Sequence, residues 1–115
     1  MDEDVGEDKL VSKVIKLADL VLYQDSAIVS RTLVDEDAGT ITLFAFDKGQ
    51  GLSEHKAPFD ALIYLLDGEA AVTISGRLFE LREGQMIIMP ANNPHSVKAI
   101  EKLKMLLIMI RSPPS

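Results

Sequence analysis

Turn-forming residues interrupt this chain at short intervals, and that spacing most strongly constrains its fold. Between the turns lie short runs rich in Val, Ile, Leu, Thr and Phe, residue types that favour strands. Short strands separated by turns every 8–12 residues or so are typical of a β-sandwich or barrel. At 115 residues the chain has room for one such domain, so the sequence predicts a single all-β domain. The turn signals are Asp25-Ser26, residues 35–39, residues 47–51, Pro58, the hairpin-type Asp67-Gly68, Ser75-Gly76, Glu83-Gly84, residues 90–94 and Glu101-Lys102.

The N-terminal residues differ in composition from the rest of the chain. Residues 1–9 carry five carboxylates against one lysine and are predicted to form a flexible acidic tail, with the barrel domain at residues 10–115. Residues 10–22 permit either a short amphipathic helix or a helical turn around Leu17-Ala18-Asp19 followed by a strand. Frequent Val and Ile and the lack of a helix cap favour the second alternative.

Charge and composition exclude several classes of function. The net charge is -6, from 12 basic and 18 acidic side chains, which argues against a nucleic-acid partner. Without cysteine there is no disulfide framework and no thiolate metal site. The longest apolar run, residues 105–110, is too short to span a membrane, and the acidic N-terminus is unlike a signal peptide. We therefore expect a cytoplasmic protein with no membrane or nucleic-acid partner.

Two segments are apolar on both faces. Polar and apolar residues interleave in 28–34, which suits a strand with one solvent-exposed face, but in residues 61–66 and 103–110 both faces are apolar. A small barrel covers only the inner face of its strands, so the outer face must meet a second layer or a partner chain. We therefore expect a homodimer. Tyr64, of opposite parity to Ala61, is expected on the outer face.

The residues with most chemical potential are the two histidines, because the usual nucleotide, phosphate, serine-nucleophile and zinc-protease motifs are not found. A single histidine on a strand is more often a packing residue than a ligand. Here each lies in a distinctive frame: Gly49-x5-His55 with Gly68 thirteen residues further on, and Gly84-x5-Pro90 with His95 five residues further on.

These two frames resemble the paired motifs of the cupin superfamily, and the resemblance runs from about Lys13 to Arg111. The family's first motif is Gly-x5-His-x-His-x3–4-Glu-x6-Gly, and its second is Gly-x5-Pro-x-Gly-x2-His-x3-Asn. The resemblance implies a jelly-roll barrel, also called a double-stranded β-helix. It also implies that His55 and His95 are two of the four protein ligands that hold Fe, Mn, Ni or Zn in cupins.

The chain departs from the cupin pattern at the other ligand positions. Ala57 stands in place of the second histidine, Ala61 in place of the glutamate, and Ala99 in place of the closing asparagine. Alanine cannot coordinate a metal, so any metal site is expected to be weak or vestigial. Asn92 replaces a glycine, and asparagine is among the residues most tolerant of a left-handed backbone.

One carboxylate lies near the degenerate site. Asp60 is one residue from Ala61 and points the other way in a regular strand, but a bulge after Pro58 would turn it inward as a possible metal ligand. The inside of the barrel is expected to form a largely apolar ligand cavity. Its expected lining residues are Phe44, Phe46, Ser53, Ala57, Ala61, Ile63 and Val97.

The cupin fold hosts many functions, so function must be argued from the site. We expect a small-molecule binding protein with the two histidines as polar anchors, suited to a partly hydrophobic anion or carbonyl compound. A metal-dependent oxygenase or isomerase, a metal-free isomerase with a histidine acid or base, and a structural or partner-binding role are the alternatives. The two alanines argue against the metal enzyme, and the retained histidines argue against a purely structural role.

Overall fold

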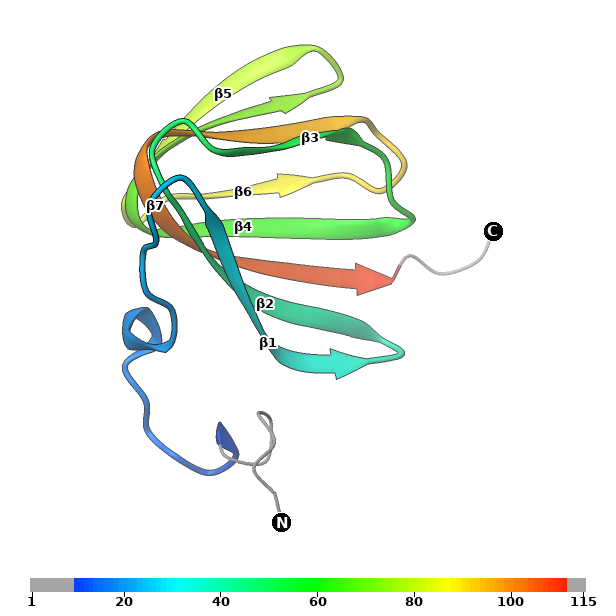
Figure 1. The fold of residues 1–115 in the computed structure, drawn as a ribbon. Coiled ribbons are helices and arrows are strands. Elements are labelled where there is room, and N and C mark those ends of the chain that lie inside the picture. Colours follow the sequence, from blue (N-terminus) through cyan, green and yellow to red (C-terminus); the bar gives the residue numbers. More distant parts are fainter. Residues whose placement is uncertain (1–9, 112–115) are drawn as a thin grey trace.

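The computed structural model describes residues 10–111, and its strands form a jelly-roll barrel (Figure 1). The predicted acidic segment lies outside the described residues, as do residues 112–115 of the predicted barrel domain. A short 3-10 helix confirms the predicted helical turn, although the first strand begins only eight residues after it. The elements are η1 (Leu17–Leu20), β1 (Ile28–Glu36), β2 (Gly39–Phe46), β3 (Gly51–His55), β4 (Phe59–Ile74), β5 (Arg77–Arg82), β6 (Met86–Met89) and β7 (His95–Arg111).

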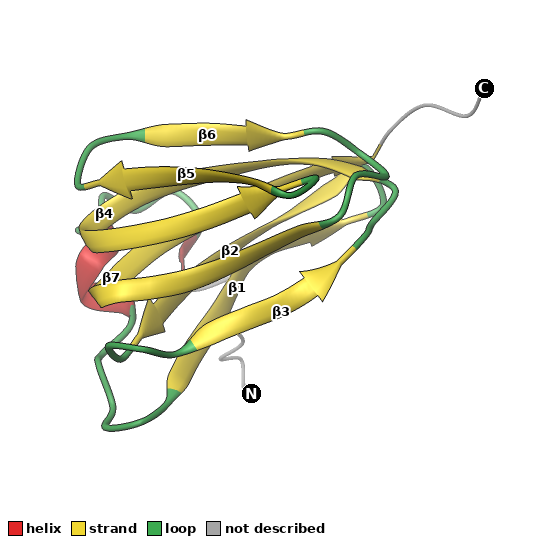
Figure 2. Ribbon diagram, turned by 90° about the horizontal axis from the view of Figure 1, so that it is seen from above, coloured by secondary structure: helices red, strands yellow, loops and turns green. Residues whose placement is uncertain are grey.

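Two long strands, β4 and β7, belong to both sheets of the barrel. The first half of β4 and the second half of β7 lie in a sheet of order β1-β2-β7-β4-β6. The remaining halves lie in a sheet of order β3-β7-β4-β5, and all pairings are antiparallel. Figure 2 shows β3 and β6 ending at the same end of the barrel, opposite η1. The expected all-β double-stranded β-helix is therefore confirmed.

Two turns predicted from the sequence are wrong. Asp67-Gly68 and Glu101-Lys102 lie inside β4 and β7, which continue through them and remain paired with each other. The register between the two strands shifts three times between Leu65 and Ala70, so bulges bend both strands from one sheet into the other. Gly68 has a φ of 87°, a conformation that serves a bulge as well as a hairpin turn, and the local sequence does not distinguish the two.

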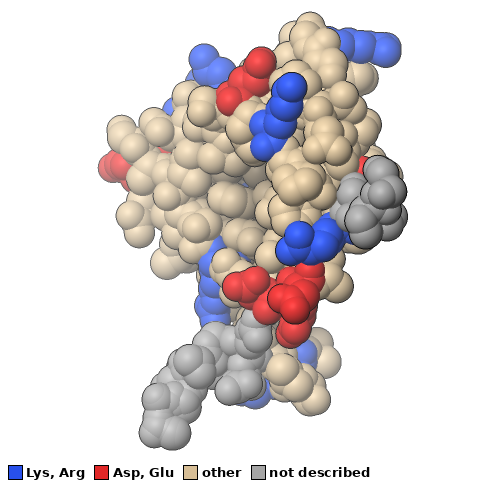
Figure 3. Space-filling model, turned by 90° about the vertical axis from the view of Figure 1, so that its right-hand side faces the viewer, with Lys and Arg blue, Asp and Glu red and all other residues tan. Residues whose placement is uncertain are grey.

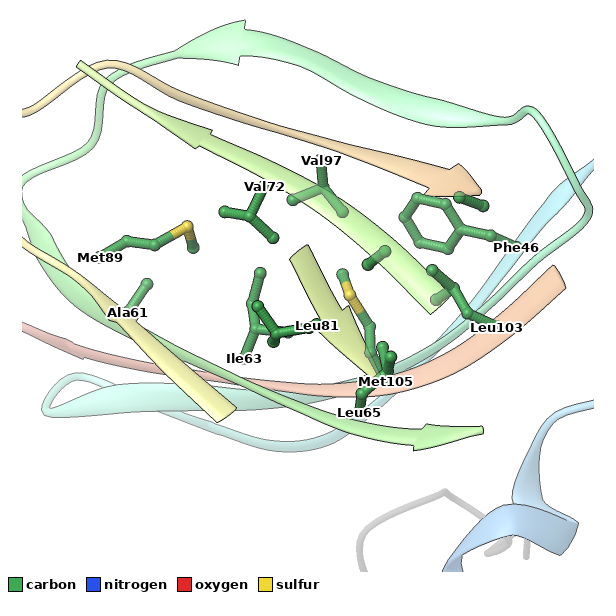
Figure 4. Close-up of a cluster of buried hydrophobic side chains, with 12 residues drawn as sticks. Phe46, Ala61, Ile63, Leu65, Val72, Leu81, Met89, Val97, Leu103 and Met105 are labelled. Carbon is green, nitrogen blue, oxygen red and sulfur yellow. The ribbon is translucent and has the colours of Figure 1, made fainter. Parts of the chain in front are cut away.

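The inside of the barrel is filled by one apolar cluster drawn from both sheets. Along β4 the burial alternates, with inward Ala61, Ile63 and Leu65 buried and outward Tyr64 exposed, as expected from its parity. Figure 4 shows the cluster, with Ala61 and Met89 at one end and Phe46 at the other.

Within residues 10–111 no helix is long and apolar enough to cross a membrane.

Part of the outer face is covered by the chain itself. The segment around η1 packs on the outward side chains of the first sheet and buries Val21 against Leu43 and Ala45, with Leu66 and Leu106 at the same contact. The second layer that the doubly apolar strands required is thus supplied in part within one chain. The rest of that face has no covering layer among the described residues.

A tyrosine anchors this covering segment to the bend in β4. The Tyr23 hydroxyl donates a 2.6 Å hydrogen bond to the Asp67 carboxylate, and the Nζ atoms of Lys102 and Lys104 lie 4.7 and 5.1 Å from the ring centroid. Burial, reinforced by Asp67, raises the pKa of Tyr23 far above its ordinary range. The tyrosine therefore remains a neutral donor to the carboxylate.

Removing this hydroxyl will destabilise the fold. We expect Tyr23→Phe to lower the free energy of unfolding by about 1–3 kcal/mol, because the hydrogen bond goes to a charged acceptor. Urea denaturation followed by circular dichroism measures the loss. Tyr64→Phe is the matched control, since the Tyr64 side chain is exposed. Equal stability of the two variants would contradict an anchoring role for Tyr23.

Candidate functional site

The two histidines form a pair across neighbouring strands at one end of the barrel. His55 ends β3, His95 begins β7, and the two residues are register partners in the antiparallel ladder. Their ring centroids are 4.5 Å apart and the rings meet edge to face at 73°. His95 is buried, with 6% of its surface exposed, whereas His55 is open to solvent. The sequence prediction that these residues share one site agrees with this geometry.

Backbone carbonyls orient both rings in the same way. His55 Nδ1 lies 2.9 Å from the Ser53 carbonyl oxygen, and His95 Nδ1 lies 3.2 Å from that of Asn93. A carbonyl only accepts, so in each neutral ring Nδ1 carries the proton and Nε2 carries the lone pair. This is the orientation in which proteins present histidine as a metal ligand or hydrogen-bond acceptor.

His95 is held in its neutral form. Burial lowers the pKa of His95, and the neighbouring His55 lowers it further, against a smaller raising effect of the hydrogen bond to Asn93. The folded protein therefore resists protonation of His95 more than the unfolded chain does. At neutral pH this side of the pair acts as an acceptor and not as a cation.

Acidification will accordingly destabilise the protein. The contribution of His95 to the free energy of unfolding is complete above its ordinary pKa of about 6.5. It is lost as the pH falls through the lowered pKa, because the unfolded chain takes up the proton first. We expect the urea midpoint to fall as the pH drops below about 6.5, and to fall less in His95→Gln. The pKa of Asp47 is lowered by backbone hydrogen bonds from Ser26 and Lys48. Its contribution to stability is therefore lost in a separate pH range, below about pH 4. An unchanged pH profile in His95→Gln would contradict this assignment.

The loop before His95 is fixed to the start of β4. The Asp60 carboxylate accepts a 2.9 Å hydrogen bond from the Ala91 amide, and the Ala57 carbonyl accepts one of 2.8 Å from the Asn92 amide. Asn92 has a φ of 66°, which confirms the left-handed backbone predicted for it. Asp60 is exposed and bonds the loop, a contact across 31 residues for which the local sequence gives no signal.

The residues expected to line a cavity are distributed over the barrel. Ala61, Ile63 and Val97 are buried in the central cluster, and Ala57 is half-buried. Ser53 is exposed, and the register between β3 and β7 shifts between Leu52 and His55. Phe44 and Phe46 share a face, as predicted, with ring centroids 5.8 Å apart, but Phe46 lies at the far end of the cluster from Ala61 (Figure 4).

A complete cupin metal site does not fit these residues. Within residues 10–111 no group of three or more His, Asp or Glu side chains is arranged to hold a metal ion. Two imidazoles supply half of a tetrahedral set and no negative charge. Figure 3 faces this end of the barrel, where uncharged residues dominate the surface. The site therefore presents two imidazole rings, and the lowered pKa of His95 keeps that ring a neutral acceptor.

The two-sheet barrel, with its two histidines paired at one end, defines the class of small jelly-roll proteins. The family model described as "Cupin domain" matches residues 42–111, which is more than half of the chain. The chain belongs to the cupin family.

Solved structures support the same conclusion, whereas no curated protein matches the chain. A conserved protein of unknown function from Streptococcus pyogenes is 38% identical, with a TM-score of 0.85 and 90% of each chain covered. A cupin superfamily protein from Desulfitobacterium hafniense is 28% identical, with a TM-score of 0.83, covering 88% of this chain and 93% of that one. A cupin 2 conserved barrel domain protein from Leptotrichia buccalis is 42% identical, with a TM-score of 0.82, covering 84% of this chain and 47% of that one.

Proposed function

We propose that this cupin binds a small molecule at the histidine-bearing end of the barrel, through Nε2 of His55 and His95. The observation that carries the proposal is the common orientation of the two rings, which turns both Nδ1 atoms to the backbone. Each Nε2 is then left as a hydrogen-bond acceptor. Ala57 and Ala61 put methyl groups where cupins place larger ligand side chains.

The chemistry of the pair favours a ligand that donates hydrogen bonds. A neutral imidazole with Nδ1 engaged offers a lone pair and no positive charge, and the lowered pKa of His95 maintains that state at neutral pH. An alcohol or N–H compound supplies the donor that such an acceptor requires. This argument replaces the anion or carbonyl compound expected from the sequence.

Proton transfer by the pair is the second candidate function, and the lowered pKa of His95 supports it. A histidine that is neutral at pH 7 is competent as a general base. Its orienting partner here is the carbonyl of Asn93 and not a carboxylate. Binding alone demands fewer groups than catalysis, so it remains the first proposal.

The ligand class is tested with three compounds of nearly equal shape: cyclohexanol, cyclohexanone and cyclohexanecarboxylate. We expect only cyclohexanol, the neutral donor, to shift the histidine Nε2 resonances in nitrogen-15 NMR spectra at pH 7.5. His55→Ala should weaken that response, while Ser53→Ala, which leaves the backbone carbonyl in place, should preserve it. A response to the carboxylate alone would overturn the proposal and indicate cationic histidines.

Metal titration distinguishes binding from the metal-dependent alternatives. We expect protein purified without a histidine tag to carry less than stoichiometric Ni, Zn, Mn or Fe, because two donors are missing. The four divalent ions are then titrated into the wild type and His55→Ala. Stoichiometric metal that is lost in the variant would overturn the proposal in favour of a metal-dependent oxygenase or isomerase.

A further inference from the structure

The loop of residues 90–94 connects the two sheets immediately before His95. It leaves β6, which pairs with β4 in the first sheet, and enters β7, which begins beside β3 in the second sheet (Figure 1). Within this loop, the Asn93 carbonyl oxygen lies 3.2 Å from His95 Nδ1 and orients the ring. The position of that carbonyl therefore decides whether Nδ1 carries the proton and Nε2 remains the acceptor.

Two hydrogen bonds hold the first part of this loop to the chain around the start of β4. The Ala91 amide donates to the Asp60 carboxylate at 2.9 Å, and the Asn92 amide donates to the Ala57 carbonyl at 2.8 Å. Asn92 has a φ of 66°, a conformation that residues other than glycine adopt only when the surrounding contacts maintain it. The Asp60 carboxylate is therefore a side-chain anchor for a backbone segment that does not hold its conformation alone.

The other end of the loop is fixed to the second sheet. The Pro94 carbonyl accepts a 2.8 Å hydrogen bond from the amide of Ser75, which lies in the turn between β4 and β5. The proline rings at residues 90 and 94 also restrict φ at both ends of the loop. Asn93 lies between the two sets of anchors, so the direction of its carbonyl depends on both of them.

We infer that Asp60 is a positioning residue for the histidine site, because its hydrogen bond to the Ala91 amide keeps the Asn93 carbonyl where it orients His95. This inference rests on the proposed function, in which Nε2 of His95 accepts a hydrogen bond from the ligand. Burial and His55 lower the pKa of His95, and the hydrogen bond to Asn93 raises it. Asp60 therefore acts through the geometry of the loop and not through its charge.

Nitrogen-15 NMR spectra of the histidine rings, recorded without ligand at pH 7.5, test this inference. In the wild type, His95 should show a protonated Nδ1 and an unprotonated Nε2. Asp60→Ala should make the two tautomers of His95 comparably populated. It should also weaken the binding of cyclohexanol about threefold, because a ligand binds only the correctly oriented fraction. Asp60→Asn keeps an oxygen that accepts from the Ala91 amide and should retain the wild-type spectrum.

Asp47 provides a matched control, because it follows Phe46 at the other end of the barrel (Figure 4). Its carboxylate accepts hydrogen bonds from the amides of Ser26 and Lys48, at 2.6 and 2.8 Å, so Asp47→Ala also frees backbone amides in an exposed loop. Asp47→Ala should lower the urea midpoint and leave the tautomer of His95 unchanged. An unchanged tautomer in Asp60→Ala, or an equal change in Asp47→Ala, would overturn the inference.

A second variant keeps the test decisive if Asp60→Ala does not fold. Asp60→Ser has a hydroxyl that is one bond too short to reach the Ala91 amide, and the same change of tautomer is expected. Failure of the proposed function would be seen separately, because the tautomer is measured without ligand. A tautomer that changes in the Asp60 variants, in a protein that does not respond to cyclohexanol, would support the positioning role and contradict the ligand proposal.

Discussion

Gly68→Ala is expected to lower the free energy of unfolding by about 3 kcal/mol or more, a large part of the 5–15 kcal/mol available to a domain. Two effects combine at this position. The φ of 87° is a left-handed conformation that costs an L-residue about 1–2 kcal/mol. A Cβ atom would also overlap the Lys102 carbonyl oxygen and lie 2.8 Å from the Leu103 Cα atom.

Gly76 provides a matched control for this substitution. Its φ of 82° is nearly the same, but a Cβ atom there meets no heavy atom within 4 Å. Gly76→Ala should therefore show only the cost of the left-handed conformation. Alanine also reduces the conformational entropy of the unfolded chain, which offsets part of that cost, so the free energy of unfolding should fall by about 1 kcal/mol. The difference between the variants isolates the close approach of β4 and β7 at the bend. Equal losses in urea denaturation would contradict that close packing.

The double substitution Ala57→His/Ala61→Glu is expected to restore a metal site and raise the affinity for Zn or Ni at least 100-fold. It returns the two ligand types that the cupin motif places at these positions beside His55 and His95. The gain should be larger than the roughly 10–100-fold loss that follows removal of a partner outside the ligand set. Isothermal titration of each metal into wild type and variant measures the change.

The carboxylate is the critical part of this restoration. Ala61 is 3% exposed, so a glutamate there is a buried charge that destabilises the metal-free variant until a cation neutralises it. We expect a melting temperature below that of the wild type without metal, and a marked rise on metal addition. Ala57→His/Ala61→Gln is the isosteric control and should gain much less. No gain in the glutamate variant would mean that residue 61 does not face the histidines.

The histidine pair could be predicted because the sequence around each histidine resembles one of the two cupin motifs. The resemblance implied the fold, and that fold brings His55 and His95 to adjacent strands. The orientation of the rings was beyond prediction, because it depends on carbonyls of Ser53 and Asn93 whose direction is set by the end of each strand.

Contacts between distant residues account for most of what the sequence did not reveal. Tyr23 and Asp67 are 44 residues apart, and Asp60 and Ala91 are 31 apart, so no local pattern links either pair. The Asp67-Gly68 turn was predicted wrongly for a related reason. A glycine with positive φ is compatible with a hairpin turn and with a bulge. The continued pairing of β4 with β7 through this position selects the bulge.

The sequence by itself determined the class of the fold, the left-handed Asn92, the inward and outward alternation along β4, and the alanines at two positions where the cupin motif has metal ligands. The Asn92 conformation and the alternation follow from residue types at short spacings, where sterics act locally, and the alanines are recognised by comparison with the family motif. Only the tertiary structure decided that β4 and β7 bend without breaking, that the segment around η1 covers part of the outer face, and that both Nδ1 atoms face backbone carbonyls. These features depend on which backbone groups and apolar surfaces meet once distant strands pair, and burial and hydrogen bonding select that arrangement for the chain as a whole.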